Sequence, residues 1–267
     1  MCRIFASRSH RPASSERTLL AAENSLRFQS REHSDGWGLA WYEEGLPRVI
    51  RSLSAAHADD QFARVTKQLK ASTLVAHVRQ ASVGEVSLDN THPFQHGRWV
   101  FVHNGTVPEW DTARPLLEEQ IDPQRRKILR GETDSERCFA LFLSKLARKC
   151  DLDAASFDHA AAALRETVAA VREASEPSPE GKASTTFLVT DGRLLIACRR
   201  GRTLHLHVPP VDDEGRVAWF AVASEHPGKV PKSFAEEGAE RSPPWRAVDE
   251  DAWVGVDASL RLHRGWL

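Results

Sequence analysis

The sequence predicts an α+β fold built on antiparallel sheets. Segments of strand type lie towards both ends of the chain, and the clearest helices are grouped between them. Strands and helices do not alternate as βαβ units, which argues against a parallel sheet of Rossmann type. No GxGxxG or P-loop pattern follows a strand, so the sequence gives no support for nucleotide binding.

The composition is that of an ordinary soluble protein. Of the 267 residues, 41% are hydrophobic and 27% are charged, and a chain of this length can bury a full-sized core. The net charge of -1 provides no basic field for nucleic acid. We find neither a signal peptide nor an apolar run of membrane-spanning length, so we expect a cytoplasmic protein with no nucleic-acid or membrane partner.

The first half of the chain is expected to hold two helices and four strands. The helices are expected over 14–29 and 59–70. The strands are expected over 37–42, 47–53, 73–78 and 98–103, and the first two are joined by a turn at Glu43-Glu44-Gly45. A loop over 79–97 joins the last two, and a loop this long inside a compact domain is usually functional.

The second half is expected to begin with two helices and to end with short strands. Apolar spacing indicates a helix over 134–150, and an Ala-rich helix follows over 155–174. The polar segment 175–184 is the best linker candidate, and the stretch 225–246 reads as irregular. The strands are expected over 185–190, 193–199, 203–208, 217–223, 253–257 and 260–263.

Cys2 is the first candidate catalytic residue. Removal of Met1 would free its α-amine, and an α-amine with a pKa of about 7.7–8.0 can exchange protons with a nearby nucleophile at neutral pH. Cys138, Cys150 and Cys198 are widely separated and form no CxxC pair. We therefore expect them to fill space as small hydrophobic side chains, without a disulfide or a metal.

Three polar clusters can complete a site around this thiol. Arg79, at a strand end, can hold an α-carboxylate through two parallel hydrogen bonds, or can pair with any surface acid. Asn104 and Gly105 follow the next strand and can donate two hydrogen bonds to an oxyanion, or can simply close a hairpin. Asp134 precedes the strongest helix, where it can bind a substrate ammonium, cap the helix, or do both. Together the clusters predict a site for an amino acid with a side-chain amide.

Six motifs support the same interpretation. In chain order they are Met1-Cys2, Asp35-Gly36-Trp37-Gly38, His77-Val78-Arg79, Asn90-Thr91-His92-Pro93-Phe94, His103-Asn104-Gly105 and Gly131-Glu132-Thr133-Asp134-Ser135-Glu136. The sequence resembles the class II glutamine amidotransferases, which are N-terminal-nucleophile (Ntn) hydrolases, densely over 1–145 and more thinly beyond. It is most similar to the stand-alone YafJ-like branch and to the related γ-glutamyl hydrolase of ergothioneine synthesis.

The resemblance implies a four-layer αββα sandwich formed by a single domain, 1–267. It implies that Cys2 is the nucleophile and that its α-amine shuttles protons. It implies that Arg79 binds the substrate α-carboxylate with Ser82 as a helper, and that Asp134 binds the substrate α-amine. Asn104 and Gly105 are expected to form the oxyanion hole. Trp37 and Gly38 are expected to form the pocket wall. His92 is expected to organise its loop and not to act as a base.

The expected reaction is hydrolysis of the γ-amide of glutamine or of a γ-glutamyl compound through a γ-glutamyl thioester on Cys2. Two other functions remain open: a glutaminase subunit that delivers ammonia to a separate synthase, and a glutamine-binding regulatory module with little turnover. We expect no cofactor. A metal site is disfavoured because no HExxH or His-x-His pattern is present among the five candidate histidines, His33, His77, His92, His96 and His103.

Overall fold

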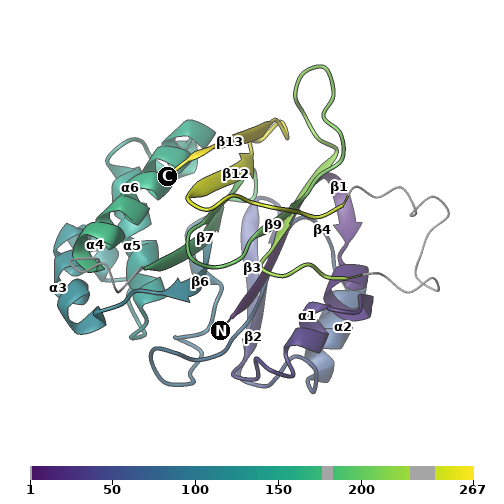
Figure 1. The fold of residues 1–267 in the computed structure, drawn as a ribbon, viewed down its shortest axis with the longest axis horizontal. Helices are drawn as coiled ribbons and strands as arrows, with labels where there is room; N and C mark the ends of the chain where they lie inside the picture. Colours follow the sequence, from purple (N-terminus) through teal and green to yellow (C-terminus); the bar gives the residue numbers. More distant parts are fainter. Residues whose placement is uncertain (1, 176–182, 229–243) are drawn as a thin grey trace.

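The computed structural model of the chain describes residues 2–175, 183–228 and 244–267 (Figure 1). Most of the expected linker 175–184 and much of the irregular stretch 225–246 lie outside these residues. Within them, no helix is both long enough and apolar enough to cross a membrane.

Two antiparallel sheets form the centre of the molecule. The first sheet has the order β11-β9-β10-β1-β4-β2-β3, and the second has the order β13-β12-β8-β7-β6-β5. The strands of the first sheet are β1 (Arg3–Ser14), β2 (Trp37–Glu43), β3 (Leu46–Ser52), β4 (Lys70–Val78), β9 (His205–His207), β10 (Trp219–Ala223) and β11 (Arg246–Ala247). Those of the second are β5 (Phe94–His96), β6 (Trp99–Thr106), β7 (Ser184–Thr190), β8 (Leu195–Arg199), β12 (Ala252–Val256) and β13 (Leu262–Trp266).

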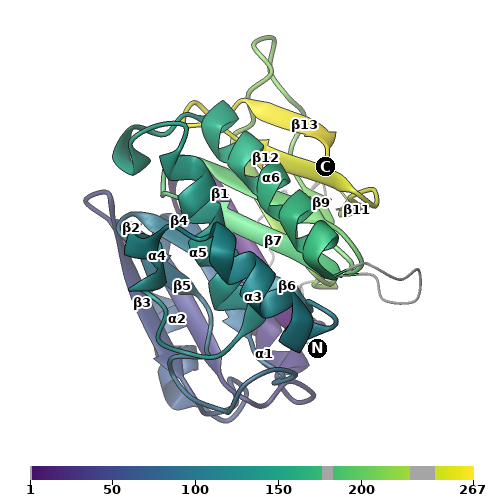
Figure 2. The same cartoon turned by 90° about the vertical axis from the view of Figure 1, so that its left-hand side faces the viewer.

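Helices cover both outer faces of this pair of sheets. On the first sheet lie η1 (Arg17–Ala21), α1 (Leu26–Gln29) and α2 (Asp60–Gln68). Figure 2 shows the helices of the other side lying over β6 and β7. They are α3 (Trp110–Gln120), α5 (Asp134–Ala147) and α6 (Phe157–Ser175), with the shorter α4 (Pro123–Arg126) and η2 (Leu152–Ala154) beside them. The layers therefore run helix, sheet, sheet, helix, which confirms the expected α+β sandwich.

The side chains of each strand alternate between two hydrophobic clusters. In β1, Ile4 belongs to the cluster between the sheets, whereas Phe5 belongs to the cluster under α1 and α2. In β6, Val102 faces the other sheet and Phe101 faces α5. Since successive residues of a strand point to opposite faces, this alternation decides which polar side chains at the strand ends reach the space between the sheets.

The structure differs from the expectations mainly at the N-terminus. The central strand β1 was not expected, and the helix expected over 14–29 is instead two short pieces, η1 and α1, separated by a break at Ala22 and Ser25. The helices α3 and α4 were also not expected, and β5 forms within the expected loop 79–97. The turn at Glu44 and Gly45 is confirmed, and both residues have the positive φ (51° and 79°) that this hairpin turn requires.

Candidate active site

Five chain segments meet at one end of the two sheets. The start of β1 pairs with the end of β4, so that Arg3 lies opposite Val78, and β2 pairs with β4 on its other side through Trp37. Across the sandwich, β6 contacts β1, and the carboxylate of Asp134 at the start of α5 accepts a hydrogen bond from the backbone just beyond β6. The segments that carry the expected site residues are therefore brought together.

Cys2 lies at the start of β1, half-buried, and its Sγ donates to the Gln80 carbonyl at 3.5 Å. Burial raises the pKa of the Cys2 thiol. The Gln80 hydrogen bond and the charge of Arg79 oppose that rise, and the Asp134 carboxylate adds to it. The thiol is thus protonated at neutral pH and needs a base before it can attack.

Arg79 is buried, with only 3% of its surface exposed. Its backbone N–H donates to Gly36 and its carbonyl accepts from Asp35, which holds it beside β2. Its Nη2 donates to three carbonyl oxygens of the following loop, at Val83 (3.3 Å), Gly84 (3.4 Å) and Glu85 (3.1 Å). Its Nη1 is buried and has no hydrogen-bond partner among the described residues. One nitrogen of the guanidinium therefore braces the loop, and the other is available to a carboxylate.

Ser82 lies at the rim of the site. Its hydroxyl is 3.5 Å from Oγ1 of Thr106, so the loop after β4 reaches the last residue of β6. Ser82 is exposed, in contrast to Arg79.

Asn104 and Gly105 are the last residues of β6 before Thr106. Asn104 is 2% exposed, and its Oδ1 has no partner within the described chain. The alternation along β6 directs its side chain into the space between the sheets, towards the end where Cys2 lies. At Gly105 a Cβ atom would overlap the carbonyl oxygen of Ser184 and come within 2.5 Å of His103 Nε2. Only glycine fits here, and it keeps β6 tightly paired with β7.

His103 supports this end of β6 from the opposite face. Its Nε2 lies 2.7 Å from the Ser184 carbonyl, which can only accept, so Nε2 carries the proton. Nδ1 lies 2.9 Å from the Ser135 hydroxyl, whose oxygen is also 3.1 Å from Oδ1 of Asp134. Burial lowers the pKa of His103, so the ring is neutral and serves as a brace.

Asp134 is 3% exposed and opens α5. The N-cap is Thr133, whose hydroxyl accepts from the Glu136 N–H at 3.2 Å, so capping does not occupy the Asp134 carboxylate. Its Oδ2 accepts from the Val107 N–H at 2.8 Å and its Oδ1 from the Ser135 N–H at 2.7 Å. Oδ1 also lies 3.1 Å from the Ser135 hydroxyl, whereas Oδ2 keeps a lone pair for an incoming ammonium. The bond from Val107 ties the carboxylate to the segment just beyond β6, the strand that carries Asn104.

Trp37 is not brought to the site, which corrects the expectation that it walls the pocket. It is fully buried on the opposite face of the first sheet, where it packs against Phe62 and donates from Nε1 to Asp59 at 2.8 Å. Gly38, one residue on, faces the space between the sheets. A Cβ atom there would overlap the His92 carbonyl, so Gly38 lets the loop of His92 lie against the sheet.

Histidines line the interior beneath the site. His77 and His92 stack with ring centroids 4.4 Å apart, and none of their four ring nitrogens has a partner among the described residues. Burial lowers the pKa of His77 to about 3 and that of His92 well below its usual range, so both rings are neutral. His92 also packs on Phe94 at 4.6 Å, which fits the expected role of loop organiser. Within the described ranges, no group of three or more His, Cys, Asp or Glu is placed to hold a metal ion.

Two residues near Cys2 were not expected as site residues. Gln80 supplies the carbonyl that accepts from the thiol, and its side chain lies 3.2 Å from His33. Asp35 accepts from the Ala81 N–H at 2.7 Å and so braces the loop after Arg79. The only signals for them in the sequence are that Asp35 opens one motif and that Gln80 follows another.

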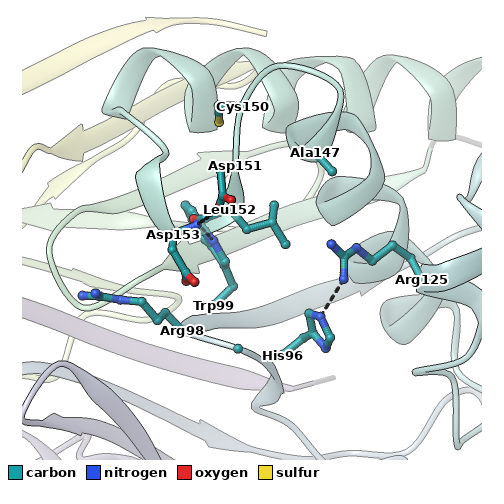
Figure 3. Close-up of a pocket in the computed structure, with 10 residues that line it drawn as sticks. His96, Arg98, Trp99, Arg125, Ala147, Cys150, Asp151, Leu152 and Asp153 are labelled. Atoms are coloured by element: carbon teal, nitrogen blue, oxygen red, sulfur yellow. Dashed lines mark hydrogen bonds between the residues drawn. The ribbon is translucent and has the colours of Figure 1, made fainter.

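A separate cavity lies at the other end of β6. It has a volume of about 540 Å³ and is bordered by the β5–β6 turn and the segment after α5. Figure 3 shows Arg125 directed at His96, to which it donates at 2.8 Å. None of the expected site residues lines this cavity.

Comparison with known proteins places these features in context. The family model described as "Glutamine amidotransferases class-II" matches residues 1–212. The chain is 25% identical over 262 residues to "Probable glutamine amidotransferase DUG3" of Saccharomyces cerevisiae, covering 91% of this chain and 69% of that protein. It is 35% identical over 123 residues to "Putative glutamine amidotransferase YafJ" of Escherichia coli, covering 44% of each.

Two further matches bear on substrate and fold. The chain is 28% identical over 204 residues to "Gamma-glutamyl-hercynylcysteine sulfoxide hydrolase" of Mycobacterium tuberculosis, covering 73% of this chain and 74% of that protein. A solved glutamine aminotransferase class-II domain protein from Silicibacter pomeroyi superposes with a TM-score of 0.65 at 20% identity, covering 100% of this chain and 99% of that one. At this identity, the likeness concerns the fold.

Proposed function

The chain belongs to the class-II glutamine amidotransferases, and on that premise we propose that it hydrolyses the γ-amide of glutamine or a γ-glutamyl compound with Cys2 as an N-terminal nucleophile. The observation that carries the proposal is that a buried Arg79 nitrogen without a hydrogen-bond partner and the Asp134 carboxylate lie at the same end of the sandwich as the Cys2 thiol. A cation and an anion in one small site match the two charges of an α-amino acid.

Binding uses these two charges. Nη1 of Arg79 receives the substrate α-carboxylate, and Asp134 receives the α-ammonium. With both ends held, the side chain of the substrate extends towards Cys2 and Asn104. Charge-assisted bonds of this kind are each worth about 1.5–3 kcal/mol, enough to orient the γ-carbonyl before reaction.

The chemical step then needs a base and an oxyanion site. The α-amine of Cys2, freed by removal of Met1, takes the thiol proton, and Sγ attacks the γ-carbonyl. Asn104 and the Gly105 N–H stabilise the resulting oxyanion, at about 2.7–4 kcal/mol for one strong donor. The amine returns the proton to the departing ammonia or amine, and water hydrolyses the γ-glutamyl thioester to give glutamate.

Arg79 and Asp134 contact only the glutamyl half of the substrate, so the leaving half is set elsewhere in the site. The M. tuberculosis relative is named for a γ-glutamyl compound larger than glutamine, which supports an amine as an alternative leaving group. We also propose that residues 1–267 act as one domain, because β12 and β13 complete the sheet that carries Asn104. The four free cysteines support a reducing, cytoplasmic setting.

The test is glutamate release from L-glutamine and from a series of γ-glutamyl amides. We expect Cys2→Ala to abolish release while leaving the fold intact, and Cys150→Ala, a half-buried thiol away from the site, to leave release unchanged. A version with extra residues fixed ahead of Cys2 is expected to be inactive, because its α-amine is blocked. Full turnover by Cys2→Ala would end the proposal. Turnover that begins only when a second protein is added would instead indicate ammonia delivery to a synthase.

A further inference from the structure

Asn90 lies in the loop that separates β4 from β5 and is 3% exposed. Both ends of its side-chain amide are used. Nδ2 donates to the Glu85 carbonyl at 3.1 Å, and Oδ1 accepts from the Glu132 N–H at 2.8 Å. A single buried side chain therefore joins two loops that are 47 positions apart in the sequence (132 minus 85).

Each of these loops leads to one of the charged groups of the site. The Glu85 carbonyl is one of the three that accept from Nη2 of Arg79. Glu132 stands two residues before Asp134 in the turn that opens α5. Asn90 thus connects the loop that binds the Arg79 guanidinium with the turn that precedes Asp134.

The two loops approach the amide too closely for ordinary side chains. A Cβ atom at Gly131 would overlap Oδ1 of Asn90, and one at Gly84, where φ is +73°, would lie 2.8 Å from Nδ2. Glycine at both positions allows the backbone to close around Asn90. Aspartate could accept from Glu132 but would face the Glu85 carbonyl without a proton to donate, so an amide is the group that fits.

The turn before Asp134 is itself fixed to its helix. The carboxylate of Glu136 accepts from the N–H groups of Arg130 at 2.7 Å and Gly131 at 3.0 Å. A shift of this turn relative to the Arg79 loop would therefore move α5 and Asp134 with it. The Asn90 amide is placed to fix the position of this turn relative to the Arg79 loop.

We propose that Asn90 is a positioning residue that sets the separation between Arg79 and Asp134, and so makes the site select ligands that carry both an α-carboxylate and an α-ammonium. This role of Asn90 rests on the proposed function, because it takes Arg79 and Asp134 as the residues that bind the substrate. It adds to that function a residue that makes the site select the α-amino acid end of the substrate.

The test compares two ligands in the full chain carrying Cys2→Ala, where no turnover interferes. L-Glutamine offers both charges, and glutaramate, the same molecule without the α-amine, offers only the carboxylate. Calorimetry gives the ratio of their dissociation constants. We expect Asn90→Ala to reduce the preference for L-glutamine by about 10-fold, as for the loss of one or two hydrogen bonds that position a charge. Gln95→Ala, an exposed amide in β5 that donates to the Gly97 carbonyl, is the matched control and is expected to leave the preference unchanged.

Gly131→Ala presses on the same contact from the other side, and we expect it to reduce the preference as well, which provides a second variant if Asn90→Ala does not fold. With Cys2 restored, alkylation of its thiol by iodoacetamide, which uses neither anchor, is expected to proceed at the wild-type rate in Asn90→Ala. An unchanged preference in a folded variant, a loss of alkylation, or no binding of L-glutamine by Cys2→Ala would overturn the inference. Binding without glutamate release by the wild-type chain would instead count against the proposed reaction alone.

Discussion

Substitution of Asn104 by alanine is expected to change the activity strongly and the free energy of unfolding little. Asn104 is 2% exposed and its Oδ1 has no partner among the described residues, so the folded protein gains little from that oxygen. Substitution by alanine removes an unsatisfied buried acceptor, whose burial costs about 1–3 kcal/mol, and also removes some packing. We expect these effects to offset each other to within about 1 kcal/mol, which corresponds to about 2–4 °C in Tm for a chain of this size.

Activity is expected to respond very differently. If Asn104 donates to the oxyanion, Asn104→Ala lowers kcat by about 10²–10³-fold, with a smaller change in KM, because the interaction forms in the transition state. Glutamate release and thermal unfolding of the same preparation measure both effects.

The control is Ser144→Ala, a buried hydroxyl far from the site whose Oγ donates to Ala140 and accepts from the Asp122 N–H. It is expected to lose about 1–2 kcal/mol of stability and to keep its kcat. If Asn104→Ala lost more than about 2 kcal/mol and kept kcat within about threefold, Asn104 would be a structural amide and the oxyanion assignment would fail.

Three further outcomes follow from the site. Arg79→Lys keeps the positive charge, but a lysine cannot both hold the loop and present a second nitrogen to the substrate. The KM for L-glutamine in the glutamate-release assay should therefore rise by about 10–100-fold. An unchanged KM would contradict the proposed binding of the α-carboxylate by Arg79. The pKa of His77 falls from about 6.5 in the unfolded chain to about 3 in the folded one, so the unfolded chain binds more protons between these values. Stability should therefore fall as pH drops below about 6.5, by up to about 1.4 kcal/mol per pH unit for this group, in urea titrations that His77→Asn should flatten. Trp37→Phe should lose about 1.5–3 kcal/mol of unfolding free energy with its bond to Asp59 while KM stays within about twofold, and a large rise in KM would return Trp37 to the pocket wall.

Most of the regular elements could be predicted because their patterns are local. The β2–β3 hairpin, β4, β6 and α5 each have a clear periodicity and clear boundary signals in the sequence. The strand β1 does not. Its sequence, RIFASRSHRPAS, is rich in Arg and Ser, and it is a strand because it pairs with β4 on one side and β10 on the other. Pairing between residues at least 56 positions apart, as for Ser14 and Lys70, is invisible to a local pattern.

In the site too, the sequence indicates the type of residue but not where its side chain points. Arg79, Asn104, Gly105 and Asp134 were expected from their chemistry, and the structure brings them to one end of the sandwich. Trp37 was placed wrongly because it adjoins Gly38 in a motif, whereas adjacent residues of a strand point to opposite faces. Proximity in sequence suggested a shared role, and the alternation of the strand separates the two residues.

Buried polar atoms without a hydrogen-bond partner occur in several parts of the described structure, and two of them belong to residues of the expected site. These are Nη1 of Arg79 and Oδ1 of Asn104, both buried without a partner in the part of the chain that the structure describes. Burying them costs free energy that a core of apolar residues would not lose. The neighbouring groups that only hold the geometry, such as Asn90 and Glu136, have all their main contacts made. A ligand with a carboxylate would supply the partner that Nη1 of Arg79 lacks. A carbonyl or oxyanion would be bound by the Nδ2 donor of Asn104 and not by Oδ1, which is itself an acceptor.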